Sequence, residues 1–341
     1  MTIRSILFVG ASLLGVLPLV ALAQATPQRD IEREALESRI EALSSELDTL
    51  QRQLETLPED PEMAADPDDV VQEEMAQRRQ LERESTRNPF AITTHRRNYL
   101  FPLSYTTNPN HPAFRDISAD NGPNDLEVKF QFSAKVNIAE DLFGDTGDVY
   151  FAFTQRSWWQ AYNTDASSPF RETNYEPEIF LDLDTNWRMF GWTNTRNRFA
   201  LNHLSNGRSE PLSRSWNRAY LESVFQRGDW AVAVAPHWRF PESQTSDDNP
   251  DIDRYMGYGD VTVARRINGD QEASLMVRGN PSAGNLGSQI DYSWPFFGNI
   301  RGHVQYYYGY GESMIDYDHR NHRLSVGFSL NPMFSGSGSV R

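Results

Sequence analysis

A strict alternation of apolar and polar residues over Leu126–Ile138 limits the folds open to this 341-residue chain. The apolar set is Leu126, Val128, Phe130, Phe132, Ala134, Val136 and Ile138, and the polar set is Glu127, Lys129, Gln131, Ser133, Lys135 and Asn137. Thirteen alternating residues exceed the usual length of a strand in a soluble protein. They are typical of a strand that crosses a bilayer in a β-barrel, with one face toward lipid and the other toward the lumen.

Similar segments recur through the rest of the chain, at 92–107, 148–160, 177–185, 188–205, 216–227, 229–240, 254–266, 271–280, 286–296, 300–310 and 319–334. Together they make twelve, and bacterial single-chain barrels have an even number of strands. We therefore predict an all-β fold, a twelve-stranded antiparallel transmembrane barrel over residues 90–334. The alternative is a soluble β-sandwich, which would have shorter strands and fewer aromatic residues at the strand ends.

The first 23 residues have the pattern of a signal peptide. Arg4 precedes the apolar run Ile6–Leu22, and Ala21-Leu22-Ala23 offers a small-x-small cleavage site. The alternative is a membrane anchor. No later segment reaches the roughly 18 apolar residues of a membrane helix. The chain has no cysteine, which excludes disulfides and thiolate chemistry.

Residues 24–57 are predicted to form a periplasmic coiled coil. Heptad spacing of four and three joins Leu36, Ile40, Leu43, Leu47, Leu50, Leu54 and Leu57, and Pro58 follows. A single amphipathic helix is the alternative. Residues 58–89 are predicted to be an acidic linker, and 335–341 a Gly/Ser-rich tail. Residues 24–89 hold 18 acidic and 8 basic residues, and this balance disfavours nucleic-acid partners.

Three polar residues at the ends of two predicted strands have an unusual orientation. Strand parity puts His203, Ser205 and Asn217 on the face opposite Arg198 and Arg218. Since charged side chains face the lumen, the three should point toward lipid, where unbonded polar groups are costly.

This set suits a serine hydrolase whose substrate is the lipid itself. Ser205 would be the nucleophile, His203 the general base and Asn217 the group that fixes the imidazole tautomer. The backbone N–H of Gly207 could stabilise an oxyanion. The alternative is that these are ordinary residues of a strand and a loop.

Several strings closely resemble those of the outer-membrane phospholipase A family. They are His203–Ser209, Ser213–Arg218, Thr154–Gln160, Ser167–Pro177, Asp248–Asp251, Tyr255–Tyr258 and Gly309–Ser313. The resemblance covers roughly Asn88–Phe334.

The resemblance implies a twelve-stranded outer-membrane barrel with Ser-His-Asn catalysis, activated by calcium-dependent dimerisation. Its substrates would be glycerophospholipids and lysophospholipids. It implies calcium ligands at the Arg208 carbonyl, at Ser213 and at Ser167 of a second copy of the chain, and it places Gln155 at the interface of the homodimer.

Two other functions remain open from the sequence. A non-catalytic channel or porin would conduct through an open lumen. A structural tether, with the barrel as anchor, would not need Ser205.

Overall fold

A computed structural model describes residues 33, 36–45, 49, 93–117, 122–243, 245, 247–267 and 271–330. The predicted signal peptide (1–23), acidic linker (58–89) and tail (335–341) lie outside the described residues. Of the heptad segment, residues 36–45 are helical, and Leu36, Ile40 and Leu43 are exposed. Pairing of this segment into a coiled coil stays a prediction.

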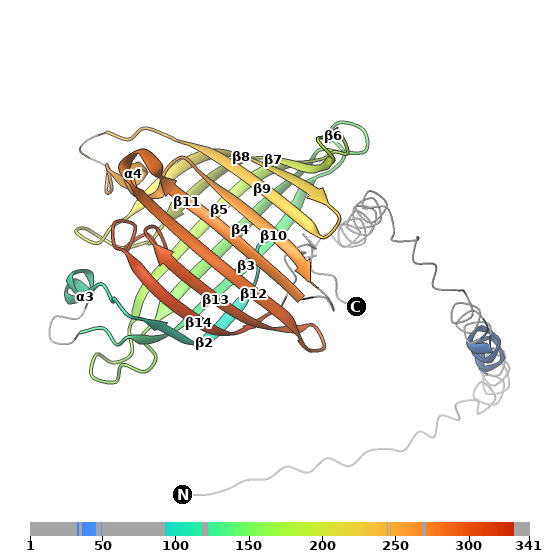
Figure 1. The fold of residues 1–341 in the computed structure, drawn as a ribbon, viewed down its shortest axis with the longest axis horizontal. Helices are drawn as coiled ribbons and strands as arrows, with labels where there is room; N and C mark the ends of the chain where they lie inside the picture. The colour runs from blue at the N-terminus through green and yellow to red at the C-terminus, as the bar shows by residue number, and fades with distance from the viewer. Residues whose placement is uncertain are drawn as a thin grey trace, which may run out of the picture. The chain divides into compact units, whose positions relative to one another are not determined.

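Twelve long strands close into one antiparallel barrel (Figure 1). They are β2 (Tyr99–Thr106), β3 (Leu126–Ala139), β4 (Asp148–Trp159), β5 (Phe170–Asp184), β7 (Trp192–Ser205), β8 (Ser215–Arg227), β9 (Trp230–Arg239), β10 (Gly259–Ile267), β11 (Gln271–Asn280), β12 (Asn285–Phe297), β13 (Ile300–Gly309) and β14 (Asn321–Ser329). Two-residue strands β1 (Thr93–Thr94) and β6 (Arg188–Met189) pair with β3 and β7. The predicted fold is confirmed.

Several predicted strand boundaries are wrong, and the segment 188–205 is interrupted between β6 and β7. The segment 92–107 is split into β1 and β2, with residues 95–98 between them. β5 begins at Phe170, although its polar first half and Pro177 suggested a start at 177. Where a strand was expected from 254, the short helix α4 (Ile252–Met256) packs Ile252 and Met256 into an apolar cluster, and β10 starts only at Gly259.

The other helical segments are also short: α3 (His111–Ile117) and the 3-10 turn η1 (Pro281–Ala283). Within the described residues, none of the helices is long and apolar enough to cross a membrane.

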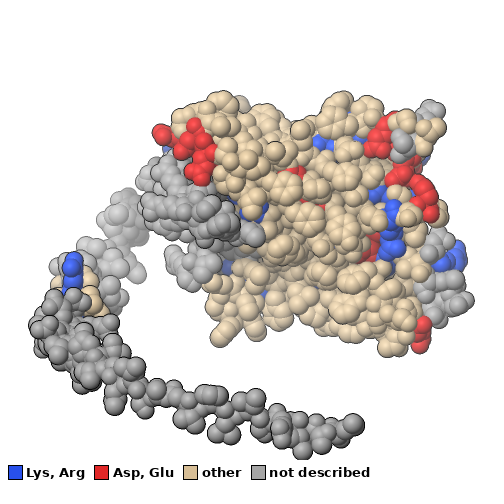
Figure 2. Space-filling model, turned by 180° about the vertical axis from the view of Figure 1, so that it is seen from behind, with Lys and Arg blue, Asp and Glu red and all other residues tan. Residues whose placement is uncertain are grey.

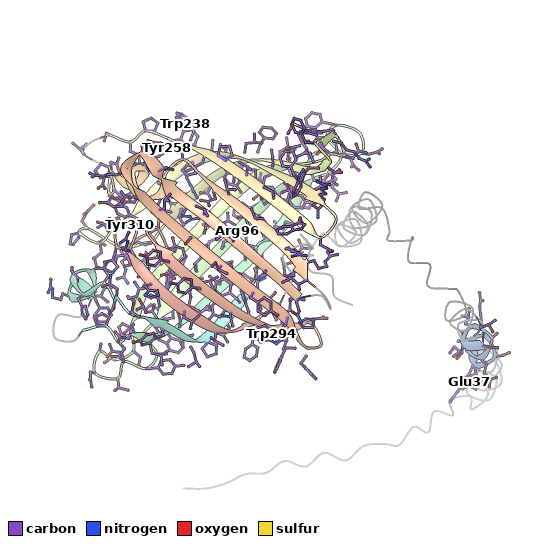
Figure 3. The ribbon with its side chains drawn as sticks, viewed as in Figure 1. Glu37, Arg96, Trp238, Tyr258, Trp294 and Tyr310 are labelled. Carbon is purple, nitrogen blue, oxygen red and sulfur yellow. The ribbon has the colours of Figure 1, made fainter. Side chains whose placement is uncertain are left out.

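The predicted alternation holds in β3. Glu127 and Lys129 are each 1% exposed inside the barrel, whereas Phe132 and Ile138 are exposed on its outer wall. The wall seen in Figure 2 is mostly uncharged, and acidic and basic side chains gather toward its ends. Aromatic residues mark both rims: Trp238, Tyr258 and Tyr310 lie toward the end that carries α4, and Trp294 lies toward the opposite end (Figure 3).

Ion pairs cross the lumen. Arg171 donates to both oxygens of Glu127 at 3.0 Å and to Asp316 at 2.6 Å, and Arg323 Nη1 lies 2.7 Å from Glu127. Lys129 extends the network to Glu312 at 2.8 Å. Each of these buried charges has an opposite charge beside it, which offsets the cost of its burial.

The barrel closes where β14 pairs with β2. The register shifts between Val326 and Phe328, and a Cβ at Gly327 would collide with the carbonyl oxygen of Leu100. Only glycine therefore lets the two backbones approach this closely at the seam.

The lumen network predicts a large stability loss for Arg171→Met. This change strands Glu127 and Asp316 with fewer partners in a buried site, so we expect the free energy of unfolding to fall by about 3–5 kcal/mol. Denaturant-induced unfolding in detergent micelles measures it. Arg115→Met, at an exposed position of α3, is the control, with an expected change within about 0.5 kcal/mol. Equal losses in the two variants would contradict the role assigned to the network.

Candidate active site

The hairpin of β7 and β8 brings the predicted catalytic residues together. The register pairs His203 with Asn217 across the two strands, and His203 Nδ1 lies 2.8 Å from Asn217 Oδ1. Ser205 is the last residue of β7, two positions beyond His203 on the same face, and pairs with Ser215. The end of this hairpin thus gathers an imidazole, an amide and a hydroxyl.

These side chains belong to the outer wall of the barrel. Phe199 and Leu201, which share their face of β7, are 50% and 55% exposed, whereas Arg198 and Asn202 on the other face are buried. The outward direction predicted from strand parity agrees with this pattern. The hydrogen bond to Asn217 offsets part of the cost of holding an imidazole beside lipid.

The hydrogen bond also selects one form of the imidazole. Asn217 Oδ1 is an acceptor, so His203 Nδ1 carries the proton, and Nε2 of the neutral ring is left with a lone pair. That lone pair can accept the hydroxyl proton of Ser205. The described residues contain no hydrogen bond between Ser205 and His203; in hydrolases this contact commonly tightens when substrate binds.

Residues on the inner face hold the His203–Asn217 pair from both sides. The neighbouring register pairs are Asn202–Arg218 and Leu204–Trp216. Arg218 donates to Asn202 Oδ1 at 2.8 Å. Trp216 is fully buried, and Leu204 packs against its cluster. Hydrogen bonds on one side and apolar packing on the other therefore fix the register of the His203–Asn217 pair.

The loop after Ser205 depends on Asn206 and Gly207. The buried Asn206 Oδ1 accepts from the N–H groups of Arg208 (3.3 Å) and Arg214 (3.0 Å), which draws the two sides of the 206–214 loop together. Gly207 has φ +64°, and a Cβ there would lie 3.1 Å from the ring of Tyr175. A left-handed conformation beside a packed ring leaves room only for glycine.

Two of the three predicted calcium ligands lie on this loop. Asn206 brings Arg208 and Ser213 to facing sides of it, and Ser213 Oγ donates to Asp248 at 2.5 Å. Glu242 lies between β9 and α4, as Asp248 does. Its pKa is raised mainly by burial and secondly by the negative charge of Asp247. A carbonyl, a hydroxyl and a nearby carboxylate form an oxygen donor set that suits Ca²⁺.

Ser167 lies apart from these ligands, on the loop between β4 and β5. It is exposed with φ +56°, and Ser168 beside it has φ +50°. Asn163 holds this loop, since its carbonyl accepts from Ser168 N at 2.8 Å and its side chain from Ala166 N at 3.2 Å. The part of the chain described here shows no hydrogen bond between Ser167 and the 206–214 loop. Left-handed non-glycine residues commonly mark functional positions.

Asn206, Asp248 and Tyr175 had no role predicted from the sequence. All three lie within strings that carried the family resemblance, and this was the one available signal for them. Asn206 acts through backbone groups of its own loop, and Tyr175 reaches Gly207 from a strand that seemed to begin later. Strand parity can place neither.

A family model described as phospholipase A1 matches residues 75–330. The phospholipase A1 of Klebsiella pneumoniae is 42% identical over 250 residues, covering 72% of this chain and 85% of the relative. The chain belongs to the phospholipase A1 family. The phospholipase A1 of Escherichia coli (strain K12) is 40% identical over 248 residues, covering 72% of this chain and 84% of the relative.

Solved structures of the phospholipase A1 family share the barrel. Outer membrane phospholipase A from Escherichia coli aligns with a TM-score of 0.68 at 39% identity, covering 72% of this chain and 93% of that one. The Salmonella typhi outer membrane phospholipase, solved as a dimer with bound calcium, gives the same TM-score at 38% identity and the same coverage. The present chain is thus a phospholipase with an outer-membrane β-barrel fold.

Gly207→Ala should lower phospholipase activity more than tenfold. The left-handed φ and the Tyr175 ring both resist a Cβ at this position, so the substitution would move the Gly207 N–H group, two residues after Ser205. The rate of phospholipid hydrolysis by purified protein measures this. Gly144→Ala is the matched control: Gly144 also has a positive φ, but its Cβ would meet nothing within 4 Å. The control should carry the conformational cost of about 1–2 kcal/mol and keep its activity. Similar activity of both variants would contradict the assignment.

Proposed function

We propose that this phospholipase hydrolyses acyl esters of glycerophospholipids and lysophospholipids with a Ser205-His203-Asn217 triad, depends on calcium, and is active as a homodimer. The observation that carries the proposal is the 2.8 Å bond between His203 and Asn217 on the lipid-facing wall, beside Ser205. The active site of the Escherichia coli enzyme also contains an asparagine, since one of its structures is an active-site mutant with asparagine replaced by alanine.

The proposed reaction has two halves. Ser205 Oγ attacks the ester carbonyl carbon while its proton passes to His203 Nε2, and His203 then returns that proton to the departing lysolipid oxygen. Water, which gives a proton to His203, next attacks the carbonyl carbon of the acyl-Ser205 ester. The acyl–Oγ bond breaks, His203 returns the proton to Ser205 Oγ, and the fatty acid is released. Asn217 keeps Nδ1 protonated throughout, and the Gly207 N–H donates to the oxygen that becomes negative.

Calcium would be held by the Arg208 carbonyl and Ser213 of one chain and by Ser167 of a second copy. Asp248 supports this, because its carboxylate lies at hydrogen-bond distance from Ser213 and adds negative charge to the set. When bound there, the ion would polarise the ester carbonyl and stabilise developing negative charge. One chain alone would hold an incomplete set, which would couple calcium binding to dimerisation.

The outer wall around Gln155 supports the proposed dimer. Its register partners are Phe132 on β3 and Tyr175 on β5, both exposed. A polar amide among exposed aromatic rings is costly against lipid tails and more favourable against a second protein surface that can hydrogen-bond to it. Two apolar walls meeting here would also form a cleft for acyl chains.

The proposed triad predicts the effect of Ser205→Ala. Loss of the nucleophile should lower phospholipid hydrolysis by roughly 10⁴-fold or more, since only binding and electrostatic stabilisation remain. Hydrolysis of phospholipid in mixed micelles measures it. Ser209→Ala, four residues on at an exposed loop position, is the control and should retain activity.

A calcium chelator should abolish activity of the unchanged chain, and added Ca²⁺ should restore it. Activity that persists in Ser205→Ala would refute the triad. Activity indifferent to chelator would refute the calcium site and leave the triad standing.

We also propose that the N-terminal segment lies in the periplasm and that its heptads hold protomers close, raising their effective concentration. Deletion of residues 24–88 should then reduce the dimer fraction at low enzyme density in the membrane. Cross-linking at decreasing protein-to-lipid ratios measures this fraction. Deletion of 58–88 alone, which keeps the heptads, is the control. Dimerisation that is unchanged by the longer deletion would dismiss this role.

A further inference from the structure

Residues 95–98 leave the barrel wall and enter the lumen. They connect β1 and β2, which both pair with the same edge of β3. Arg96 reaches Glu176 on β5, and Arg97 reaches Glu272 on β11, each at 3.0 Å. Since these partners belong to different walls, the segment crosses the interior, and Figure 3 shows Arg96 within the outline of the barrel.

Arg96 binds Glu176 with both arms of its guanidinium. Nη1 donates to Oε2 at 3.0 Å and Nη2 to Oε1 at 3.1 Å, and Nη2 also lies 3.2 Å from Glu178 Oε1. A two-armed pair fixes the plane of a carboxylate as well as its position. Arg96 also lies between two carboxylates that project from the same face of β5, whose repulsion it relieves.

Glu176 in turn contacts the two strands that carry the triad. Its Oε1 accepts from Asn202 Nδ2 at 2.8 Å and from Arg218 Nη2 at 3.3 Å. Asn202 and Arg218 form the register pair directly next to His203 and Asn217. The inner pair and the outer pair are consecutive residues of the same two strands, so a shift of one displaces the other.

We infer that Arg96 is a positioning residue for the reaction: through Glu176 it fixes the Asn202–Arg218 pair, and through that pair the distance between His203 and Asn217 on the opposite side of the wall. This rests on the proposed triad. Arg96 touches no substrate. It acts because Arg218 must be shared between Glu176 and Asn202, and the orientation of Glu176 decides how it is shared.

Arg96→Met and Arg97→Met test this as a matched pair. Both remove a partly buried cation from the same segment, but Arg97 pairs with Glu272 on β11 and lies near His303 on β13. In the full-length protein with calcium, Arg96→Met should lower kcat about 10- to 100-fold, with KM within about twofold, because misplacing a catalytic pair slows the chemical step. Arg97→Met should keep the kcat of the unchanged chain. Arg96→Lys should recover part of kcat, since it keeps the charge and loses the two-armed contact.

A second measurement follows the path through Glu176. Glu176→Gln should lower kcat similarly, and the double variant Arg96→Met with Glu176→Gln should lose no more than either alone, because residues of one chain of contacts are not additive. The Glu176→Gln variant also tests the inference if Arg96→Met does not give a folded barrel, which circular dichroism reveals.

Three outcomes overturn the inference: unchanged kcat in Arg96→Met, an equal kcat loss in Arg97→Met, and multiplicative losses in the double variant. If the unchanged chain hydrolyses no phospholipid, the proposed function fails and takes the inference with it. If the unchanged chain is fully active and Arg96→Met has the same kcat, the positioning role is refuted and the proposed function stands.

Discussion

Hydrocarbon cannot solvate charge, and this constraint decides which way every residue of the barrel strands faces. Glu127, Lys129 and Arg323 have no acceptable position outside, so their strands turn that face inward, where each charge meets its opposite. Strand alternation then leaves no choice for the residues between them. His203 and Asn217 face lipid because Asn202 and Arg218 face the lumen.

The inner and outer faces of β7 and β8 therefore have different roles. Inside, Glu176, Asn202 and Arg218 form a hydrogen-bonded set, and Trp216 packs with Leu204. Outside, His203 and Asn217 bond one another beside the serine. A network buried in a medium of low polarity has few alternative arrangements, and the proposed catalytic pair, which is exposed to fluid lipid, needs that rigidity.

Much of this architecture could be predicted from the sequence, and the reason is the alternation itself. The alternation predicted the number of strands, the charges that face the lumen and the outward direction of His203, Ser205 and Asn217. It failed where other forces decide. Ile252 and Met256 form a helix because of an apolar cluster distant in sequence. The first half of β5 is polar because Arg171, Glu172 and Asn174 bond to residues 314–316, between β13 and β14. Asn206 and Asp248 act through contacts that no periodic pattern encodes. The ion pairs of Arg96 and Arg97 join residues about 80 or more positions apart, beyond the reach of any local rule.

The seam at Gly327 has a consequence for how the chain tolerates damage. β2 is the first long strand of the barrel and β14 is the last. Neither has a further strand that could replace the pairing between them. Proteolytic removal of the last strand would expose two rows of unpaired N–H and C=O groups to hydrocarbon at once, a cost of several kcal/mol for each group. A chain clipped there would carry this cost along two strands at once, so the fold has little tolerance for damage at its closure.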